Sequence, residues 1–223
     1  MVASFFMHPT SSSAAPRPRS IVYIDGFNLY YGAIKGGPNK WLNLERYFSQ
    51  LRHGDDPKRI YYFTSKVDGP SRSDQEIYLR ALATLPLVEV RLGRFKLKTV
   101  QCRVQACAHS GSKFFKAMEE KQTDVAIGIQ MLLDAYDDNC DRFVIVSGDS
   151  DLLPAVTTIK RLFPAKELIV YIPATNALRG AATELRGIAD KDRTLPQALL
   201  RHCLFPAQVP DGAGGFIDKP SGW

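Results

Sequence analysis

The sequence lacks any apolar stretch long enough to cross a bilayer. Its longest apolar runs, such as Phe143–Val146 and Leu168–Ile172, have the length of β-strands, whereas a membrane-spanning helix needs about 20 apolar residues. We therefore expect a soluble protein with no membrane partner. Cysteine is also scarce, with four in 223 residues, and no typical signal peptide is present, so we expect reduced thiols rather than a disulfide framework.

The N-terminal segment lacks acidic residues as well. It carries serines and the cations Arg17 and Arg19 before its first acid, Asp25. This composition keeps an organellar transit peptide open as an alternative. A secretory signal is not indicated, because no cation precedes the short apolar patch Val2–Met7 and that patch does not continue. Our expectation is a cytoplasmic protein.

Acidic residues are missing between Glu89 and Glu119, although the chain as a whole carries 29 basic and 23 acidic residues, a net charge of +6. Such a basic segment is typical of a protein that binds a nucleic-acid backbone. The alternative is an edge-like strand whose lysines are simply solvated. Seven cations lie in this interval: Arg91, Arg94, Lys96, Lys98, Arg103, Lys113 and Lys116.

Within that interval, Arg94–Lys98 alternates charged and apolar residues, which predicts an extended strand or ribbon that shows its cations to one side. We interpret residues 93–118 as an insertion. Phe114 and Phe115 near its end are either exposed for base stacking or buried against the core, and burial is the commoner fate of phenylalanine.

Composition predicts one compact domain, since 45% of the residues are hydrophobic and 23% are charged. Residues 1–19 are rich in Ser, Ala and Pro, and 205–223 are rich in Pro and Gly, so both ends are expected to be disordered or loosely attached. The expected organisation is an N-terminal tail over 1–19, a domain over 20–190 and a largely irregular C-terminal extension over 191–223.

Apolar runs and helical periodicity alternate between these ends. Several of the runs are apolar throughout, as expected for strands covered on both faces of a parallel sheet, and the alternation predicts a three-layer α/β domain with a mainly parallel central sheet. The predicted strands are Ser20–Ile24, Arg59–Thr64, Leu87–Leu92, Arg142–Ser147 and Glu167–Ile172. The predicted helices are Leu42–Leu51, Ser73–Ala83, Thr123–Tyr136, Asp151–Arg161 and Asn176–Gly187. The third helix is predicted to have one apolar face made of Val125, Ile129, Leu132, Leu133 and Tyr136.

Carboxylates follow two of the predicted strands and open the third helix. Asp25 and Asn28 follow the first strand, Asp124 begins the helix, and Ser147–Asp151 follows the fourth strand. All three places share one edge of a parallel sheet, where ligands of open α/β sheets bind. Taken singly, each acid could instead serve a turn, a helix dipole or an N-cap.

Together, four aspartates at one edge would repel one another unless a cation neutralised them. An all-oxygen set selects Mg²⁺ or Mn²⁺ rather than Zn²⁺, and such ions can lower the pKa of a bound water and stabilise the leaving oxygen of a phosphoryl displacement. We expect Asp25, Asp124 and Asp149 to be ligands or bridges, and Asp151 to complete the set directly or through water. Asn28 can orient water or a phosphate oxygen, and Ser147 and Ser150 can donate hydrogen bonds. None of the four histidines lies next to these segments, so a histidine base is not indicated.

Three segments in this order, Ile24–Leu29 (IDGFNL), Glu120–Val125 (EKQTDV) and Val146–Leu152 (VSGDSDL), resemble the motif series of NYN-domain proteins of the LabA-like branch, within the PIN-like nuclease superfamily. The resemblance covers about residues 20–189. It implies a PIN-like (Rossmann-like) fold with sheet order 3-2-1-4-5 and a metal-dependent endoribonuclease that leaves a 5′-phosphate. It assigns the family's acidic positions to Asp25, Asp124, Asp149 and Asp151, and its polar position to Asn28. A homodimer is compatible with such a domain, although no patch in the sequence demonstrates one.

Many proteins of this branch carry a cysteine pair shortly before the Glu-Lys motif. Here the pair is Cys102 and Cys107, with His109 close by. The spacing is looser than in a zinc knuckle and only three ligands are present, so we do not expect structural Zn²⁺ there.

Two other functions remain open from the sequence. One is a non-catalytic RNA-binding or regulatory module, which the basic segment also favours. The other is a phosphatase or nucleotide hydrolase, because a carboxylate cluster can act on many phosphoesters and a fold does not fix a substrate. The sequence contains neither a GxxxxGK[ST] nor a GxGxxG phosphate loop.

Overall fold

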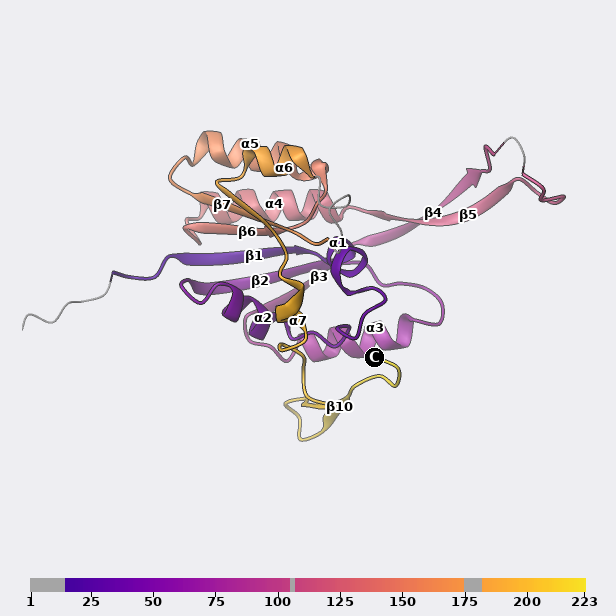
Figure 1. Cartoon of the computed structure of the whole chain (residues 1–223), viewed down its shortest axis with the longest axis horizontal. Coiled ribbons are helices and arrows are strands. Elements are labelled where there is room, and N and C mark those ends of the chain that lie inside the picture. Colours follow the sequence, from indigo (N-terminus) through magenta and orange to yellow (C-terminus); the bar gives the residue numbers. More distant parts are fainter. Residues whose placement is uncertain (1–14, 105–106, 175–181) are drawn as a thin grey trace, which may run out of the picture.

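A six-stranded parallel sheet is the centre of the fold, in the order β3-β2-β1-β6-β7-β8 (Figure 1). The computed structural model describes residues 15–104, 107–174 and 182–223. The expected N-terminal tail therefore lies mostly outside the described residues. The strands of the sheet are β1 (Arg19–Asp25), β2 (Asp56–Thr64), β3 (Val88–Leu92), β6 (Arg142–Val146), β7 (Glu167–Ile172) and β8 (Lys191–Thr194).

Helices cover both faces of the sheet and make the domain three-layered (Figure 1). Alternation along β1 sends Val22 and Ile24 into one core cluster and Ile21 and Tyr23 into the other, as the two-residue period of a strand requires. One face carries α2 (Leu44–Leu51), α3 (Arg72–Leu82) and α7 (Gln197–Leu200). The other carries α4 (Thr123–Tyr136), α5 (Leu153–Leu162) and α6 (Thr183–Ile188).

The predicted fold class and sheet order are confirmed, because β3-β2-β1-β6-β7 is the order 3-2-1-4-5 of the five predicted strands. Strand β8 was missed. Its sequence, Lys-Asp-Arg-Thr, is exposed throughout, so it has none of the apolar character that marked the other strands. The predicted helix Asn176–Gly187 begins outside the described residues, and α6 starts at Thr183.

The basic insertion is a two-stranded antiparallel ribbon made of β4 (Arg94–Gln101) and β5 (Phe114–Lys121). It projects from the carboxyl-terminal edge of the sheet, well away from the body of the domain (Figure 1). The predicted extended ribbon is therefore confirmed.

The apolar face predicted for α4 does not pack on the sheet. Of its five residues, Leu132 is partly buried against the core, whereas Val125, Ile129, Leu133 and Tyr136 are 50–81% exposed. The helix packs mainly through residues such as Ile127 and Met131. The prediction was therefore wrong for four of the five residues, because α4 is apolar on more than one side and spacing alone does not show which side faces the core.

The C-terminal extension is part of the core and is not loosely attached. Leu195, Leu200, Cys203, Val209 and Ile217 are all buried in the cluster beneath α2 and α3. The backbone N–H of Phe205 donates to the carbonyl of Trp41 at 2.9 Å, and the two rings lie 5.4 Å apart. A small hairpin, β9 (Gln208–Pro210) with β10 (Phe216–Asp218), follows. Its short elements and many Pro and Gly residues hid this packing from the sequence.

Among the described residues, no helix has both the length and the apolar character needed to span a membrane.

Candidate metal centre

The loops after β1 and β6 and the first turn of α4 meet at one edge of the sheet, as predicted. Asp25 ends β1 and caps the short helix α1 (Gly26–Leu29), with its Oδ1 atom accepting from the Asn28 N–H at 2.9 Å. Asp149 caps the 3₁₀ turn η2 (Ser150–Leu152) by accepting from the Asp151 N–H at 3.0 Å. Asp124 lies in the first turn of α4. Each acid is thus placed by the start of a helix or helical turn.

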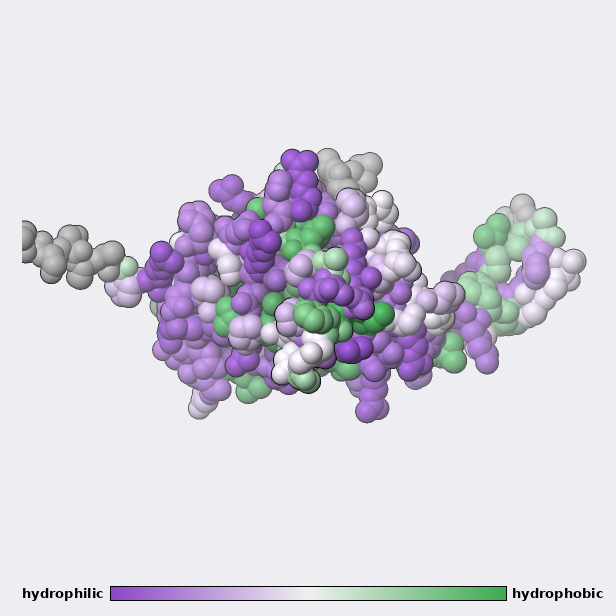
Figure 2. All heavy atoms as spheres, turned by 90° about the horizontal axis from the view of Figure 1, so that it is seen from below, coloured by the Kyte–Doolittle hydropathy of each residue, from purple (hydrophilic) through white to green (hydrophobic). Residues whose placement is uncertain are grey.

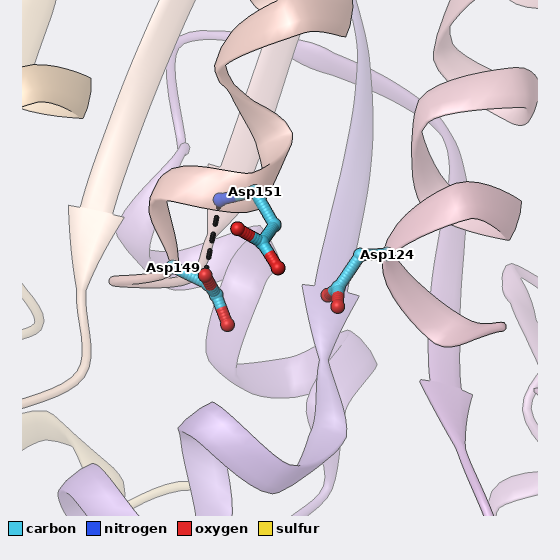
Figure 3. Close-up of side chains that lie close together, drawn as sticks. All are labelled: Asp124, Asp149 and Asp151. Atoms are coloured by element: carbon cyan, nitrogen blue, oxygen red, sulfur yellow. Dashed lines mark hydrogen bonds between the residues drawn. The ribbon is translucent and has the colours of Figure 1, made fainter. Parts of the chain in front are cut away.

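Three of the four predicted aspartates form one cluster. Carboxylate oxygens of Asp124, Asp149 and Asp151 all lie within 4.8 Å of one another, and Figure 3 shows the three side chains converging between α4 and η2. Asp124 and Asp149 are half-buried, and Asp151 is exposed. In the described ranges, no other three side chains of His, Cys, Asp or Glu converge in this way.

Asp25 is more deeply buried than this cluster, at 3% exposed, and both of its oxygens accept hydrogen bonds. Its Oδ2 atom accepts from Asn28 Nδ2 at 2.5 Å and from Ser147 Oγ at 3.2 Å. The same two side chains also accept hydrogen bonds from the loop after β6. The Asp149 N–H donates to Ser147 Oγ at 3.1 Å, and the Gly148 N–H donates to Asn28 Oδ1 at 3.2 Å. Asp25 therefore fixes the relative position of the two loops.

The electrostatics of the site favour a cation. Burial is the first cause that raises the pKa of Asp124 to about 6, and the negative charges of the neighbouring aspartates add to it. Burial also raises the pKa of Asp25 against its stabilising hydrogen bonds. A divalent cation would remove the repulsion between these carboxylates. The donor set contains only oxygen and offers an exposed side at Asp151, so it suits Mg²⁺ or Mn²⁺.

The predicted cations are spread over the ribbon and its root. Arg91 lies on β3, where it pairs with Glu89 at 2.6 Å and lies over the ring of Tyr61. The others, Arg94, Lys96, Lys98, Arg103, Lys113 and Lys116, are all exposed along the ribbon or at its tip. Figure 2 shows hydrophilic and hydrophobic residues together on this projecting ribbon.

The strand register sorts these cations onto two faces, since directly opposed residues share a face. Arg94, Lys96 and Lys98 alternate along one face, and Lys121 lies opposite Arg94. Lys116 lies opposite Thr99 and so belongs to the other face. Sequence reasoning missed Lys121, because it follows the two glutamates that end the acid-free interval. Only the hairpin register could have added it.

The ribbon also carries exposed rings. Phe114 and Phe115 are 58% and 52% exposed, so they are not buried against the core, although burial is common for phenylalanine. At the root of the ribbon, Phe95 meets Phe27 of α1 edge to face, with ring centroids 5.5 Å apart. The ribbon thus begins next to the residues that follow Asp25.

The thiols of Cys102 and Cys107 are free and partly exposed, and His109 is exposed nearby. These three side chains do not form a convergent ligand group among the described residues.

A model of the NYN domain matches residues 19–191. The chain belongs to the NYN-domain family. It is 31% identical to 6-hydroxy-3-succinoylpyridine 3-monooxygenase HspA of Pseudomonas putida (strain DSM 28022 / S16), over 92% of this chain and 75% of that protein. The crystal structure of a protein of unknown function from Vibrio parahaemolyticus matches with a TM-score of 0.53 and 18% identity, over 82% of this chain and 96% of the other. That likeness concerns the fold, and the NYN domain places the chain in a nuclease-like superfamily.

Proposed function

We propose that this NYN-domain protein is a divalent-metal-dependent endoribonuclease. The observation that carries the proposal is the convergence of Asp124, Asp149 and Asp151 within 4.8 Å at the carboxyl edge of an NYN-type sheet. The exposed cations of the adjacent ribbon are suited to the phosphates of a polynucleotide.

In this proposal Asp124, Asp149 and Asp151 hold Mg²⁺ or Mn²⁺. When bound, the cation supplies positive charge to the phosphate oxygens and makes a water molecule easier to ionise. Asp151 is the exposed member of the set and so faces the substrate side. Asp124 must be ionised to bind the cation, and a bound cation would lower its raised pKa.

Asp25 acts as a positioning residue and as a fourth negative charge close to the cluster. It holds the amide of Asn28 and the hydroxyl of Ser147 by hydrogen bonds, and Ser147 in turn holds the backbone of Asp149. Asn28, being neutral, can orient a water or a phosphate oxygen. Ser150, in the turn that Asp149 caps, offers a further hydroxyl donor. These hydrogen bonds keep the metal ligands in place. Asp25 is not itself a ligand in this proposal, because both of its oxygens already accept hydrogen bonds.

Cleavage of labelled single-stranded RNA by the purified full chain tests the proposal, with Mn²⁺, with Mg²⁺ and with EDTA. We expect cleavage only with a metal, and a loss of more than about 100-fold in Asp149→Asn, because a ligand contributes at least as much as the groups that orient it. Asp137→Asn is the matched control, since this acid is exposed at the other end of α4.

The other outcomes separate the remaining functions. RNA that is retained through chelation but never cut would replace the nuclease with a non-catalytic RNA-binding or regulatory module. Hydrolysis of mononucleotides without cleavage of polymers would replace it with a phosphatase or nucleotide hydrolase. Cleavage that is unchanged in Asp149→Asn would contradict the assignment of the site.

The curated relative supports a second candidate, oxygenation of a substituted pyridine, because its 31% identity extends over 92% of this chain. A monooxygenation takes up dioxygen, two electrons from a reductant and two protons, places one oxygen atom in the product and releases the other as water. Incubation with 6-hydroxy-3-succinoylpyridine, dioxygen and a reduced pyridine nucleotide tests it. Substrate-dependent oxygen consumption by the pure protein would favour this candidate, and its absence would remove it.

A further inference from the structure

An aromatic cavity of about 290 Å³ lies beside α1 and α3, and the metal centre does not use it. Its volume is near the lower end of the range for small-ligand pockets. That size suits a single ring system better than a larger molecule. Six rings contribute to its lining: Phe27, Tyr30, Tyr31, Tyr62, Tyr78 and Trp223.

The inner wall of the cavity is held in place before any ligand arrives. Tyr62 and Tyr78 are each 8% exposed, and the Tyr78 hydroxyl donates to the Leu42 carbonyl at 2.8 Å. The ring of Trp223 lies 5.7 Å from that of Tyr78, and its indole N–H donates to Asp74 at 3.2 Å. Rings that are already ordered lose little entropy when a planar ligand stacks on them.

The lining of the cavity also contains an exposed ring and a few polar groups. Tyr31 is 44% exposed and stacks on Phe27, with centroids 6.1 Å apart. Asn39 brings an amide into the lining, and its Oδ1 atom is buried without a hydrogen-bond partner within the described part of the chain. A buried acceptor of this kind is costly unless a donor reaches it. A planar ring that carries N–H groups fits both features.

The cavity and the metal centre share the short helix α1. Gly26, which lines the cavity, directly follows Asp25. Phe27 and Tyr31 also line a second hollow, together with Asn28 and Gly148 of the site. Phe27 further contacts Phe95 at the root of the ribbon. A polymer that binds along α1 can therefore contact the ribbon, the cavity and the carboxylates at the same time.

We propose that this cavity takes one unpaired base of a single-stranded RNA whose backbone lies at the carboxylate cluster. The inference rests on the proposed ribonuclease function and adds the form of the substrate: a nucleotide next to the reacting phosphate is unstacked from its neighbours and held between rings. Aromatic stacking of this kind tolerates all four bases, and insertion is easiest for a strand that is not paired. The cavity thus favours single-stranded over duplex substrates.

Blocking the cavity tests the proposal without touching the metal centre. Ser71 lines the cavity, is exposed and makes no capping hydrogen bond to α3, so Ser71→Phe is expected to put a ring into the cavity with little effect on folding. Ser73→Phe is the matched control, since Ser73 is exposed on the same helix outside the lining. Binding is measured in EDTA, where the proposed cleavage cannot proceed, to a short RNA and to a series with one abasic position each.

For the wild-type chain and Ser73→Phe, we expect one abasic position to weaken binding about 5- to 150-fold, the range for loss of one stacked base. Ser71→Phe should bind the intact RNA as weakly as the wild-type chain binds that abasic RNA. Its binding should not change further when that base is removed. Equal binding of every abasic RNA by the wild-type chain would overturn the proposal. So would a free mononucleotide that binds as tightly as the RNA and is lost in Ser71→Phe, because the ligand would then be a small molecule. Metal-dependent cleavage, assayed separately, reports on the proposed function itself.

Discussion

At the scale of single residues, two glycines allow α1 to lie close enough to the sheet to place the site. A Cβ atom at Gly26 would lie 2.7 Å from the carbonyl oxygen of Phe63, and one at Gly32 would lie 1.9 Å from that of Pro173. Gly32 belongs to the π-helical turn η1 (Tyr30–Ile34) that continues α1. The absence of a side chain at these positions brings Asn28 next to the β6 loop.

Gly32→Ala is expected to destabilise the fold by about 1–3 kcal/mol, because the added methyl group overpacks a contact with backbone. Urea unfolding measures the change. Gly54→Ala is the matched control, since nothing lies within 4 Å of a Cβ atom there, and it should stay within about 0.5 kcal/mol of wild type. Equal stability of the two variants would show that α1 does not need this close approach.

The ion pair between Arg19 and Asp141 predicts how the stability of the fold changes at low pH. The Arg19 side chain donates to the carboxylate at 2.7 Å and 3.2 Å, its backbone N–H also donates at 2.8 Å, and these bonds lower the pKa of Asp141 to about 2. A depressed folded-state pKa contributes stability above the unfolded value of about 3.8, and that contribution is lost as pH falls towards 2.

We therefore expect wild type to be more stable than Asp141→Asn at pH 6, with the difference shrinking between about pH 4 and pH 2. Denaturant unfolding at several pH values measures it. The effect is reduced by solvent, because the Asp141 side chain is 45% exposed. A difference that grows as the pH falls would contradict the assignment of this ion pair.

At the scale of elements, the ribbon presents a row of cations on one of its faces. Arg94, Lys96 and Lys98 alternate on that face, but the backbone register also places Glu119 across from Lys96. Lys98 lies across from Ala117 in the same register, and it is the one of the three that lies nearest the tip of the ribbon. Phosphate contacts of this kind position a nucleic acid without reading its bases.

Lys98→Glu is expected to weaken RNA binding at low salt and to reduce the dependence of affinity on salt by about one unit of slope, as expected for the loss of a phosphate contact. The matched control is Lys58→Glu, at the start of β2 and so at the opposite edge of the sheet from the site. Equal losses in the two variants would mean that the net charge of the chain, and not the ribbon, governs binding.

At the scale of the whole molecule, features marked by apolar runs and by acids at strand ends could be predicted from the sequence. Runs such as Phe143–Val146 predicted the strands of the sheet. The position of Asp149 shortly after that run predicted its place in the carboxylate cluster. The structure of polar segments could not be predicted in this way. Strand β8 is wholly exposed, yet it pairs with β7. The aromatic cavity joins Phe27 to Trp223, residues that only the tertiary fold brings together.

Distances within the site also depended on the fold. Topology correctly predicted that four aspartates share one edge of the sheet, but it could not show that Asp25 is more deeply buried than the other three, with both oxygens hydrogen-bonded. In the proposed function, that difference leaves Asp124, Asp149 and Asp151 to hold the metal and Asp25 to hold the loops.

Binding of Mn²⁺ to the purified chain, followed by calorimetric titration, tests this central claim most directly. We expect saturable binding that is lost in Asp124→Asn and retained in Asp137→Asn, because only the first removes a carboxylate from the cluster. Circular dichroism of both variants confirms that the fold is intact. Binding that persists unchanged in Asp124→Asn, or that the wild-type chain fails to show, would contradict the account.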